Sequence, residues 1–440
     1  MQPMKIFPPS LLLLFATASP LSASDLNNIY QLARTNDAQI LGSEASLEAA
    51  REAKPIARSG LLPQIFVSGA GTAITSRQAD NSWNRTEAAI DLSQPLYDRE
   101  AYMGYKQADH IVDQAEALYH GDEQTLIMRV AEAYFGVLAS EDDVTFSKAE
   151  ARAILKQLDQ ATQRYDVGLI PVTDVHESQA RYDGARSALI LAENNLQNNR
   201  EVLREIIGKD PGKLAKLKQK IPLIGPKPAS IKHWTSTALK NNPDVIAAQE
   251  EVRIAEKEVE VIRSGHFPTA DVVAGASTYN DSGRRDVFVN GDDDARIGLR
   301  LNIPLYTGGR VTHSTRQARS RLRAARSGLE AAKRRVTRNS NDAYRGIFSG
   351  ISQVKALKAT TISTQSALAA TEAGYEVGNR TLVDVLNSQR DVFRADSALA
   401  VSRYDYVLNH LRLKDAAGTI TETDLKKVNR QLYIRGKVSE

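Results

Sequence analysis

The 440-residue sequence has no cysteine, few aromatic residues and no long apolar run after its N-terminus. Without cysteine the chain cannot have a disulfide, a thiolate metal site, a cysteine nucleophile or a lipid-modified N-terminal cysteine. No segment after residue 24 offers roughly 18 consecutive apolar residues, so we expect no membrane-spanning helix in the mature chain. An aromatic share of 6% beside abundant Ala, Gln, Arg and Glu is typical of long helices rather than compact cores.

The N-terminus has the layout of a secretory signal peptide. One Lys precedes an apolar stretch from Leu11 to Ala18, and small residues follow it. This stretch is too short to cross a hydrocarbon core of roughly 30 Å. We therefore expect a signal peptide over 1–24, cleavage after Ala23 or Ser24, and an exported mature chain.

The sequence contains an internal repeat. Residues 164–208 align without a gap on 374–418, and fourteen of the 45 pairs are identical, Asp174/Asp384 and Gly208/Gly418 among them. The relation extends outward to the segments SGLLP and SGHFP, which begin at residues 59 and 264. Two copies of one unit are therefore predicted, over 25–208 and 231–418. A Pro- and Lys-rich linker over 209–230 joins them, and a C-terminal tail segment over 419–440 follows.

Each unit is predicted to hold a polar helix, two strands, a long helix, a tip turn and a return helix, which makes the chain mainly α with a small β portion. The first unit has these elements at 38–58, 64–74, 86–96, 97–164, 166–171 and 172–208. The second has them at 244–263, 269–279, 294–304, 306–373, 376–381 and 382–418. A helix of nearly 70 residues is on the order of 100 Å long, so it needs packing partners along its whole length, as in a coiled coil.

The predicted strands have one apolar face. The last of them alternates most clearly, with Ile297, Leu299, Leu301 and Ile303 on one side. Strands of about ten residues suit a tilted outer-membrane barrel, but four strands cannot close one. At least two chains must then contribute, and three chains would supply twelve strands. A small soluble antiparallel sheet is the alternative.

Several motifs resemble the TolC family of outer-membrane channel-tunnels. They are the duplicated unit itself, the turns RYDVGLIPVTDV and GYEVGNRTLVDV, the PLY motifs at 95–97 and 304–306, and the signal peptide. The resemblance implies a homotrimer in which a twelve-stranded transmembrane β-barrel in outer-membrane lipid continues into a periplasmic helical barrel. It also implies that the protein is the exit duct for type I secretion and drug efflux from a Gram-negative cell. Because it has no cysteine, the chain does not match the lipid-anchored branch of the family.

The duplicated acidic residues are the main functional candidates. Asp174 and Asp384 both lie six residues after a tip glycine, and in a cyclic trimer each would form a ring of three carboxylates. Such a ring favours cations and should raise the carboxyl pKa values. First-turn helix capping is the alternative.

The resemblance assigns further roles at the turns. It places Asp384 in the periplasmic constriction, with Asn387 where the family has a second acidic ring. It implies that Tyr375, Arg380, Thr173 and Asp174 form the bonds that keep the tunnel closed. The same resemblance makes the tips the docking site of a periplasmic adaptor, which would link the duct to an inner-membrane ABC or proton-driven transporter. These tip residues are Val167, Gly168, Leu169, Val377, Gly378 and Asn379.

No motif points to catalysis. The seven His residues are scattered without metal-site spacing, and no phosphate loop is present, so we expect no enzyme activity, no metal and no cofactor.

Two other functions fit parts of the sequence. The Arg-rich segment 310–345 alone resembles a nucleic-acid-binding helix. However, at the 210 offset its basic residues fall opposite acidic ones, which suggests ordered pairing of two helices in a ring and no nucleic-acid partner. These pairs are Arg319, Arg323, Arg326 and Lys333 with Asp109, Asp113, Glu116 and Glu123. A periplasmic coiled-coil adaptor would share the long hairpins, but it would not need an apolar strand face.

Overall fold

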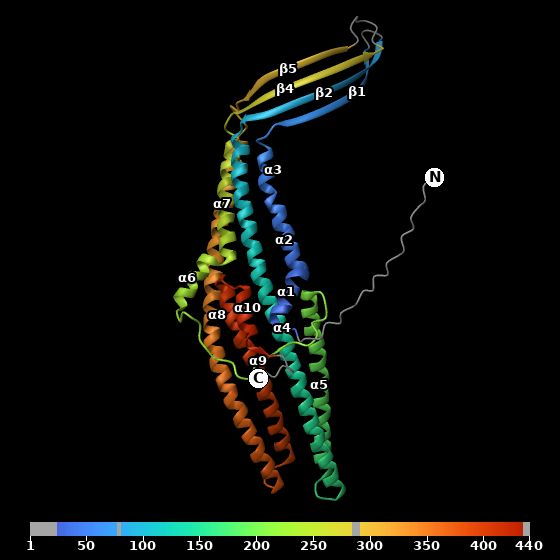
Figure 1. The fold of residues 1–440 in the computed structure, drawn as a ribbon, viewed down its shortest axis with the longest axis vertical. Helices are drawn as coiled ribbons and strands as arrows, with labels where there is room; N and C mark the ends of the chain where they lie inside the picture. The colour runs from blue at the N-terminus through green and yellow to red at the C-terminus, as the bar shows by residue number, and fades with distance from the viewer. Residues whose placement is uncertain (1–23, 77–80, 284–290, 434–440) are drawn as a thin grey trace, which may run out of the picture.

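A computed structural model describes residues 24–76, 81–283 and 291–433. The predicted signal peptide, apart from residue 24, lies outside the described residues. The chain is elongated, with a four-stranded sheet at one end and long helical hairpins at the other (Figure 1). In the part of the chain that the structure describes, no helix is both long and apolar enough to cross a membrane.

The two repeats follow the same order of elements. The first comprises α1 (Leu26–Asn36), α2 (Ala38–Arg51), α3 (Ala53–Ser59), β1 (Gln64–Ser76), β2 (Asn81–Tyr97), α4 (Arg99–Asp166) and α5 (Val172–Ile207). The second comprises α6 (Ile231–Asn241), α7 (Pro243–Ser264), β4 (Thr269–Ser282), β5 (Gly291–Asn302), α8 (Arg310–Glu376) and α9 (Leu382–Ala416). The linker and the C-terminal segment add β3 (Lys216–Leu217), α10 (Glu422–Asn429) and β6 (Leu432–Tyr433).

Some boundaries differ from the predicted ones. The helix expected over 38–58 is two helices, because Pro55 removes a backbone donor and crowds the preceding turn. Its counterpart α7 has no proline after its first position and is continuous. Strand β2 has 17 residues and starts five residues before the predicted strand, while β5 ends at Asn302 rather than at 304.

Four of the strands form one antiparallel sheet in the order β1-β2-β4-β5. Pairing of β2 with β4 joins the two repeats at its centre. The apolar side chains of β5 face outward and are bare in the single chain, with Ile297 82% and Leu299 68% exposed. Leu301 and Ile303 are also more than half exposed, although Ile303 lies just past the end of the strand. Among the described residues, β1 and β5 each have one edge that pairs with no other strand.

An ion pair crosses the opposite face of this sheet above a glycine. Arg296 on β5 donates to Asp91 on β2 at 2.9 Å, although β4 lies between these strands. The side chains pass over Gly275 of β4, where a Cβ would lie 2.8 Å from the Asp91 Oδ1 atom. The missing side chain therefore leaves the space that the pair occupies.

Gly275→Ala should displace this ion pair. Because both partners are about half exposed or more, the pair contributes only about 0–1 kcal/mol, so we expect a loss of unfolding free energy below about 1 kcal/mol. Denaturation of Gly275→Ala, Asp91→Asn and the double variant measures the coupling. If the double variant lost the sum of the two single losses of unfolding free energy, the absence of a side chain at Gly275 would not be what permits the ion pair.

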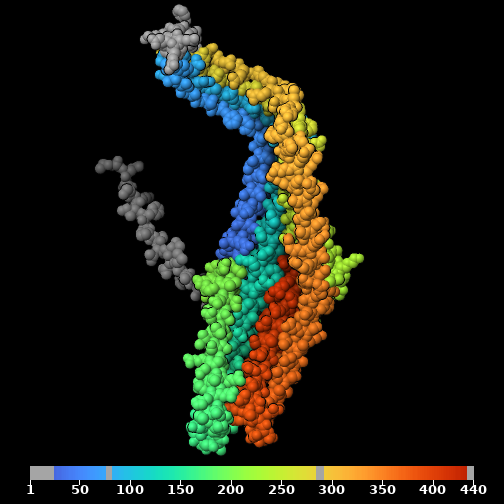
Figure 2. Space-filling view, turned by 180° about the vertical axis from the view of Figure 1, so that it is seen from behind, coloured from blue at the N-terminus to red at the C-terminus, as the bar shows by residue number. Residues whose placement is uncertain are grey.

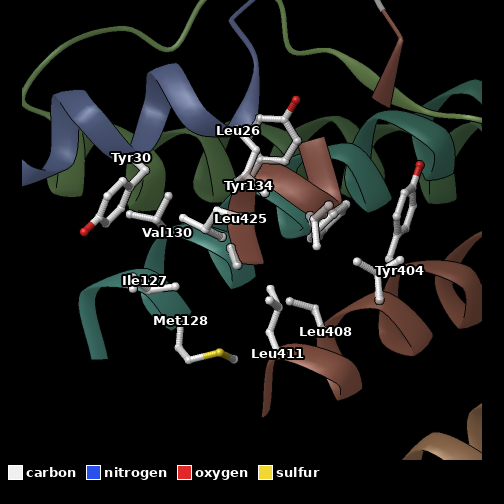
Figure 3. Close-up of a cluster of buried hydrophobic side chains, with 14 of the residues drawn as sticks. Leu26, Tyr30, Ile127, Met128, Val130, Tyr134, Tyr404, Leu408, Leu411 and Leu425 are labelled. Carbon is white, nitrogen blue, oxygen red and sulfur yellow. The ribbon is translucent and has the colours of Figure 1, made fainter. Parts of the chain in front are cut away.

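The largest hydrophobic core lies midway along the helices, where the two repeats meet. Figure 3 shows Tyr134 of α4 among Leu26, Leu411 and Leu425, which come from α1, α9 and α10. The Tyr134 hydroxyl donates to the carbonyl of Ala215 in the linker at 2.7 Å. Beside it, β3 of the linker pairs with β6 of the C-terminal segment. Linker and C-terminal segment therefore help to hold the repeats together.

The basic stripe of α8 (Arg319, Arg323, Arg326 and Lys333) does not pair with the acidic stripe of α4 (Asp109, Asp113, Glu116 and Glu123) within the described chain. Arg326 of the basic stripe contacts Glu256 of α7 at 2.8 Å. In the acidic stripe, Asp109 contacts Lys54 of α3 at 2.7 Å, and Glu116 contacts Arg51 of α2 at 3.1 Å. These three residues thus contact the shorter helices of their own repeats, and pairing of long helix with long helix is not seen among the described residues of a single chain.

Candidate functional site

The candidate site lies at the end of the molecule opposite the sheet, where the α4–α5 and α8–α9 hairpins run side by side (Figure 2). Each hairpin reverses at a glycine in the left-handed region, Gly168 with φ of 75° and Gly378 with φ of 79°. Their amides donate to the carbonyls of Tyr165 and Tyr375 at 2.8 and 3.1 Å. Glycine has no Cβ to oppose this conformation, so the Val-Gly pair ends both long helices.

Asp384 is part of a capping box at the start of α9. Its Oδ2 atom accepts the Thr381 amide and the Thr381 hydroxyl at 3.0 Å each, and its own amide donates to the Thr381 Oγ1 atom at 3.2 Å. The hydrogen bonds from Thr381, with a smaller effect of Arg380, lower the pKa of Asp384. Within one chain the capping interpretation is therefore confirmed, and the carboxylate is held in its charged form.

The equivalent position in the first repeat is built differently. Asp174 also lies in the first turn of its helix, but the N-cap residue of α5 is Pro171, which has no side-chain acceptor to offer. The exposed Thr173 directly precedes Asp174. The two duplicated aspartates therefore share a place in the repeat but not a set of hydrogen bonds.

Two contacts join the hairpins near their tips. The guanidinium of Arg164 on α4 lies 5.1 Å from the centre of the Tyr375 ring on α8, within cation–π range. Deeper in, Arg181 of α5 donates to the Asn387 Oδ1 atom of α9 at 3.3 Å. Asn387, expected only as the loss of an acidic ring, is thus a hydrogen-bond acceptor between the two repeats.

A small apolar cluster supports these polar contacts. It takes residues from both hairpins, including Ile154 of α4 and Leu386 of α9, and Tyr375 packs against its edge. Burial of this cluster favours the hairpins lying together, because apolar area is removed from water. The tips could separate only by breaking these contacts.

The turns themselves expose apolar side chains. Val167 and Leu169 are 70% and 73% exposed on one tip, and Val377 is 71% exposed on the other. Gly168, Gly378 and Asn379 complete the two turns. Large apolar side chains this bare, at the extreme end of a molecule, are typical of a contact surface.

Within one chain, Tyr375 and Asn387 contact residues that the sequence did not indicate. Tyr375 contacts Arg164, whereas the Arg380 side chain lies over Gly374 of its own turn. Arg164 and Arg181 were not among the predicted residues, since both look like ordinary charged positions on long helices. Their partners are 211 and 206 residues away, so no local sequence pattern could reveal them.

Comparisons with known proteins agree with this architecture. The family model for outer membrane efflux protein matches residues 29–209 and 234–419, which are the two repeats. Outer membrane protein TolC of Vibrio cholerae is 38% identical over 422 residues, covering 96% of both chains. Alkaline protease secretion protein AprF of Pseudomonas aeruginosa is 27% identical, covering 91% of this chain and 85% of the relative.

A solved structure shows the same fold. The Campylobacter jejuni CmeC outer membrane channel superimposes with a TM-score of 0.76 at 17% identity, covering 99% of each chain. The family model covers most of the sequence, and the TolC relative exceeds 30% identity over nearly its full length. The chain therefore belongs to the outer membrane efflux protein family.

Proposed function

We propose that three copies of this chain form a continuous duct that receives its cargo from an inner-membrane transporter through a periplasmic adaptor. The chain is an exit duct in the outer membrane of a Gram-negative bacterium, and its family is one of channels rather than enzymes. The placement of the sheet and the hairpin tips at opposite ends of helices of 68 and 67 residues carries the proposal.

The open sheet edges support the trimer. An unpaired edge in lipid leaves backbone donors and acceptors without partners, at a cost of several kcal/mol for each group. Pairing of β5 with β1 of the next copy removes both edges, and three copies close twelve strands. The bare apolar side chains from Ile297 to Ile303 then face the lipid.

The relatives indicate classes of cargo and not individual substrates. TolC-like relatives and a protease secretion protein lie in the same family, so small toxic compounds and secreted proteins are both proposed substrates. The exposed tips around Val167 and Val377 are the proposed contact for the adaptor.

The hairpin tips are the proposed gate. In the closed duct, Arg164–Tyr375 and Arg181–Asn387 hold the second hairpin against the first. Opening is an untwisting of the α8–α9 hairpin once its contacts at Arg380 and Asp384 are lost. In the trimer three Asp384 carboxylates surround the axis, where their charge favours cations.

Single-channel recording in a planar bilayer tests the gate. Asp384→Ala removes both the charge and the acceptor for Thr381, so we expect a higher conductance and weaker cation preference than in the unmodified duct. Asp384→Asn keeps an acceptor, so it should weaken the cation preference while leaving the conductance closer to the unmodified value.

Asp174→Ala is the comparison variant, because it removes the carboxylate at the same repeat position without breaking a capping box, and so separates the loss of charge from the loss of the cap. If Asp384→Ala left both conductance and ion preference unchanged, the gating role of this residue would be wrong.

A further inference from the structure

Three side chains of types that can bind metals meet on the seam between the repeats, far from the tips. His110 and Asp113 lie one turn apart on α4, and Glu250 faces them from α7. The Nδ1 atom of His110 is 3.0 Å from the Glu250 Oε2 atom and 4.0 Å from the Asp113 Oδ2 atom. All three donor atoms lie within 4.8 Å of one another.

We propose that His110, Asp113 and Glu250 bind a divalent transition metal, with Zn²⁺ as the best match. An imidazole and two carboxylates are ligands that Zn²⁺ accepts, and their two negative charges would neutralise the ion. Ligands at the usual Zn²⁺ bond lengths in a tetrahedron are about 3.3 Å apart, so the most distant donors need to close by at most about 1.5 Å.

The surroundings of Glu250 favour a binding site. The residue is only 6% exposed, and its other oxygen accepts the Arg253 guanidinium at 2.7 Å. This bond fixes the carboxylate and leaves the Oε2 atom directed at His110. Arg253 thus orients the carboxylate in the way that outer-shell partners orient metal ligands. Asp113 is 56% exposed, so an ion could enter from its side and keep water in the fourth position.

The internal repeat shows that the fold does not require these side chains. At the offset of 210, the counterparts of His110 and Asp113 on α8 are Ser320 and Arg323. At the offset of 205, which relates the two SG segments, the counterpart of Glu250 on α2 is Ala45. None of these three residues could replace its counterpart as a metal ligand. The three ligands are therefore specific to the α4–α7 seam, where a bound ion would fasten the first repeat to the second.

Zinc binding to the purified full-length protein in detergent tests this inference. After metal is removed with EDTA, Zn²⁺ is titrated in competition with a chromophoric chelator, and Co²⁺ is added separately to record its visible absorption. We expect one tight Zn²⁺ per chain and a Co²⁺ spectrum typical of tetrahedral coordination. Zn²⁺ should also raise the melting temperature, because it binds only the folded seam.

Two variants separate a metal site from a simple hydrogen bond. Asp113→Asn removes one exposed ligand but leaves the His110–Glu250 contact intact, and it should weaken Zn²⁺ binding by more than about tenfold. His110→Ala should abolish binding at this site.

His120→Ala is the matched control, because His120 lies on the same helix with a single carboxylate, Glu123, at 3.0 Å. We expect this variant to bind Zn²⁺ as the unmodified protein does. Equal Zn²⁺ affinity in the unmodified protein, Asp113→Asn and His120→Ala would overturn the proposal and leave the cluster as an ion-paired seam.

Discussion

Gly418→Ala is expected to lose about 4 kcal/mol or more of unfolding free energy, enough to prevent assembly of the duct. Gly418 follows the end of α9 with φ of 66°, a left-handed conformation that costs a residue with a Cβ about 1–2 kcal/mol. The larger effect is steric. A Cβ at this position would lie 2.4 Å from the carbonyl oxygen of Asn241 and 2.5 Å from the Cα of Asn242.

The contact is with backbone, so no side-chain rotation can relieve it. Asn241 is the last residue of α6, and Asn242 is the N-cap of α7. The side-chain Nδ2 of Asn242 also donates to the carbonyl of Ala416 at 3.2 Å. Moving this loop would disturb the point at which α7 begins beside α4 and α8. The cost of Gly418→Ala therefore combines backbone strain with overpacking at the junction of several helices.

The internal repeat provides a matched control in Gly208→Ala. Gly208 has φ of 74°, but a Cβ there would be 3.3 Å from the Cβ of Asn36, which is a side-chain atom. This variant should show only the left-handed penalty of about 1–2 kcal/mol. Denaturant unfolding and the yield of assembled protein measure both variants. Equal losses would show that the backbone clash at Gly418 is relieved at no cost.

Leu299→Lys is expected to block insertion of the sheet into the outer membrane. Leu299 is 68% exposed on the apolar face of β5, between Ile297 and Leu301. A lysine on a lipid-facing strand costs about 2–4 kcal/mol near the middle of the bilayer. In the proposed trimer this cost arises three times.

Asn302→Lys is the control for Leu299→Lys. It adds the same charge to β5 on the opposite face, where Arg296 and Arg300 also lie. Cell fractionation and unheated gel electrophoresis should show Asn302→Lys as an assembled outer-membrane protein and Leu299→Lys as unassembled. If both variants assembled equally well, the face containing Leu299 would not contact lipid.

Much of the fold was predictable because its signals are local. The Val-Gly turns at 167–168 and 377–378, the uninterrupted helical pattern before them and the alternation in β5 each depend on neighbouring residues. Boundaries were less reliable. Pro55 divides a helix that its repeat counterpart keeps whole, although the predicted pattern treated the two alike.

The candidate site was predictable only where one residue acts on its own turn. Asp384 and Thr381 are three residues apart, so a capping box could be expected at the start of α9. The charge stripes show the opposite case. Their match at an offset of 210 suggested that the long helices pair in a ring, and within one chain Arg326 instead contacts Glu256 and Glu116 contacts Arg51. Sequence spacing cannot tell which neighbour a charged face will meet.

The repeat, the element order, the tip glycines and the apolar strand face follow from the amino-acid order alone, because capping, periodicity and turn chemistry act within a few residues. Packing of the two repeats places β2 beside β4 and α4 beside both α7 and α9. That placement brings Arg164 to Tyr375 and Glu250 to His110. Partners 140 to 211 residues apart meet only when the repeats pack, since no local interaction encodes a contact across that distance.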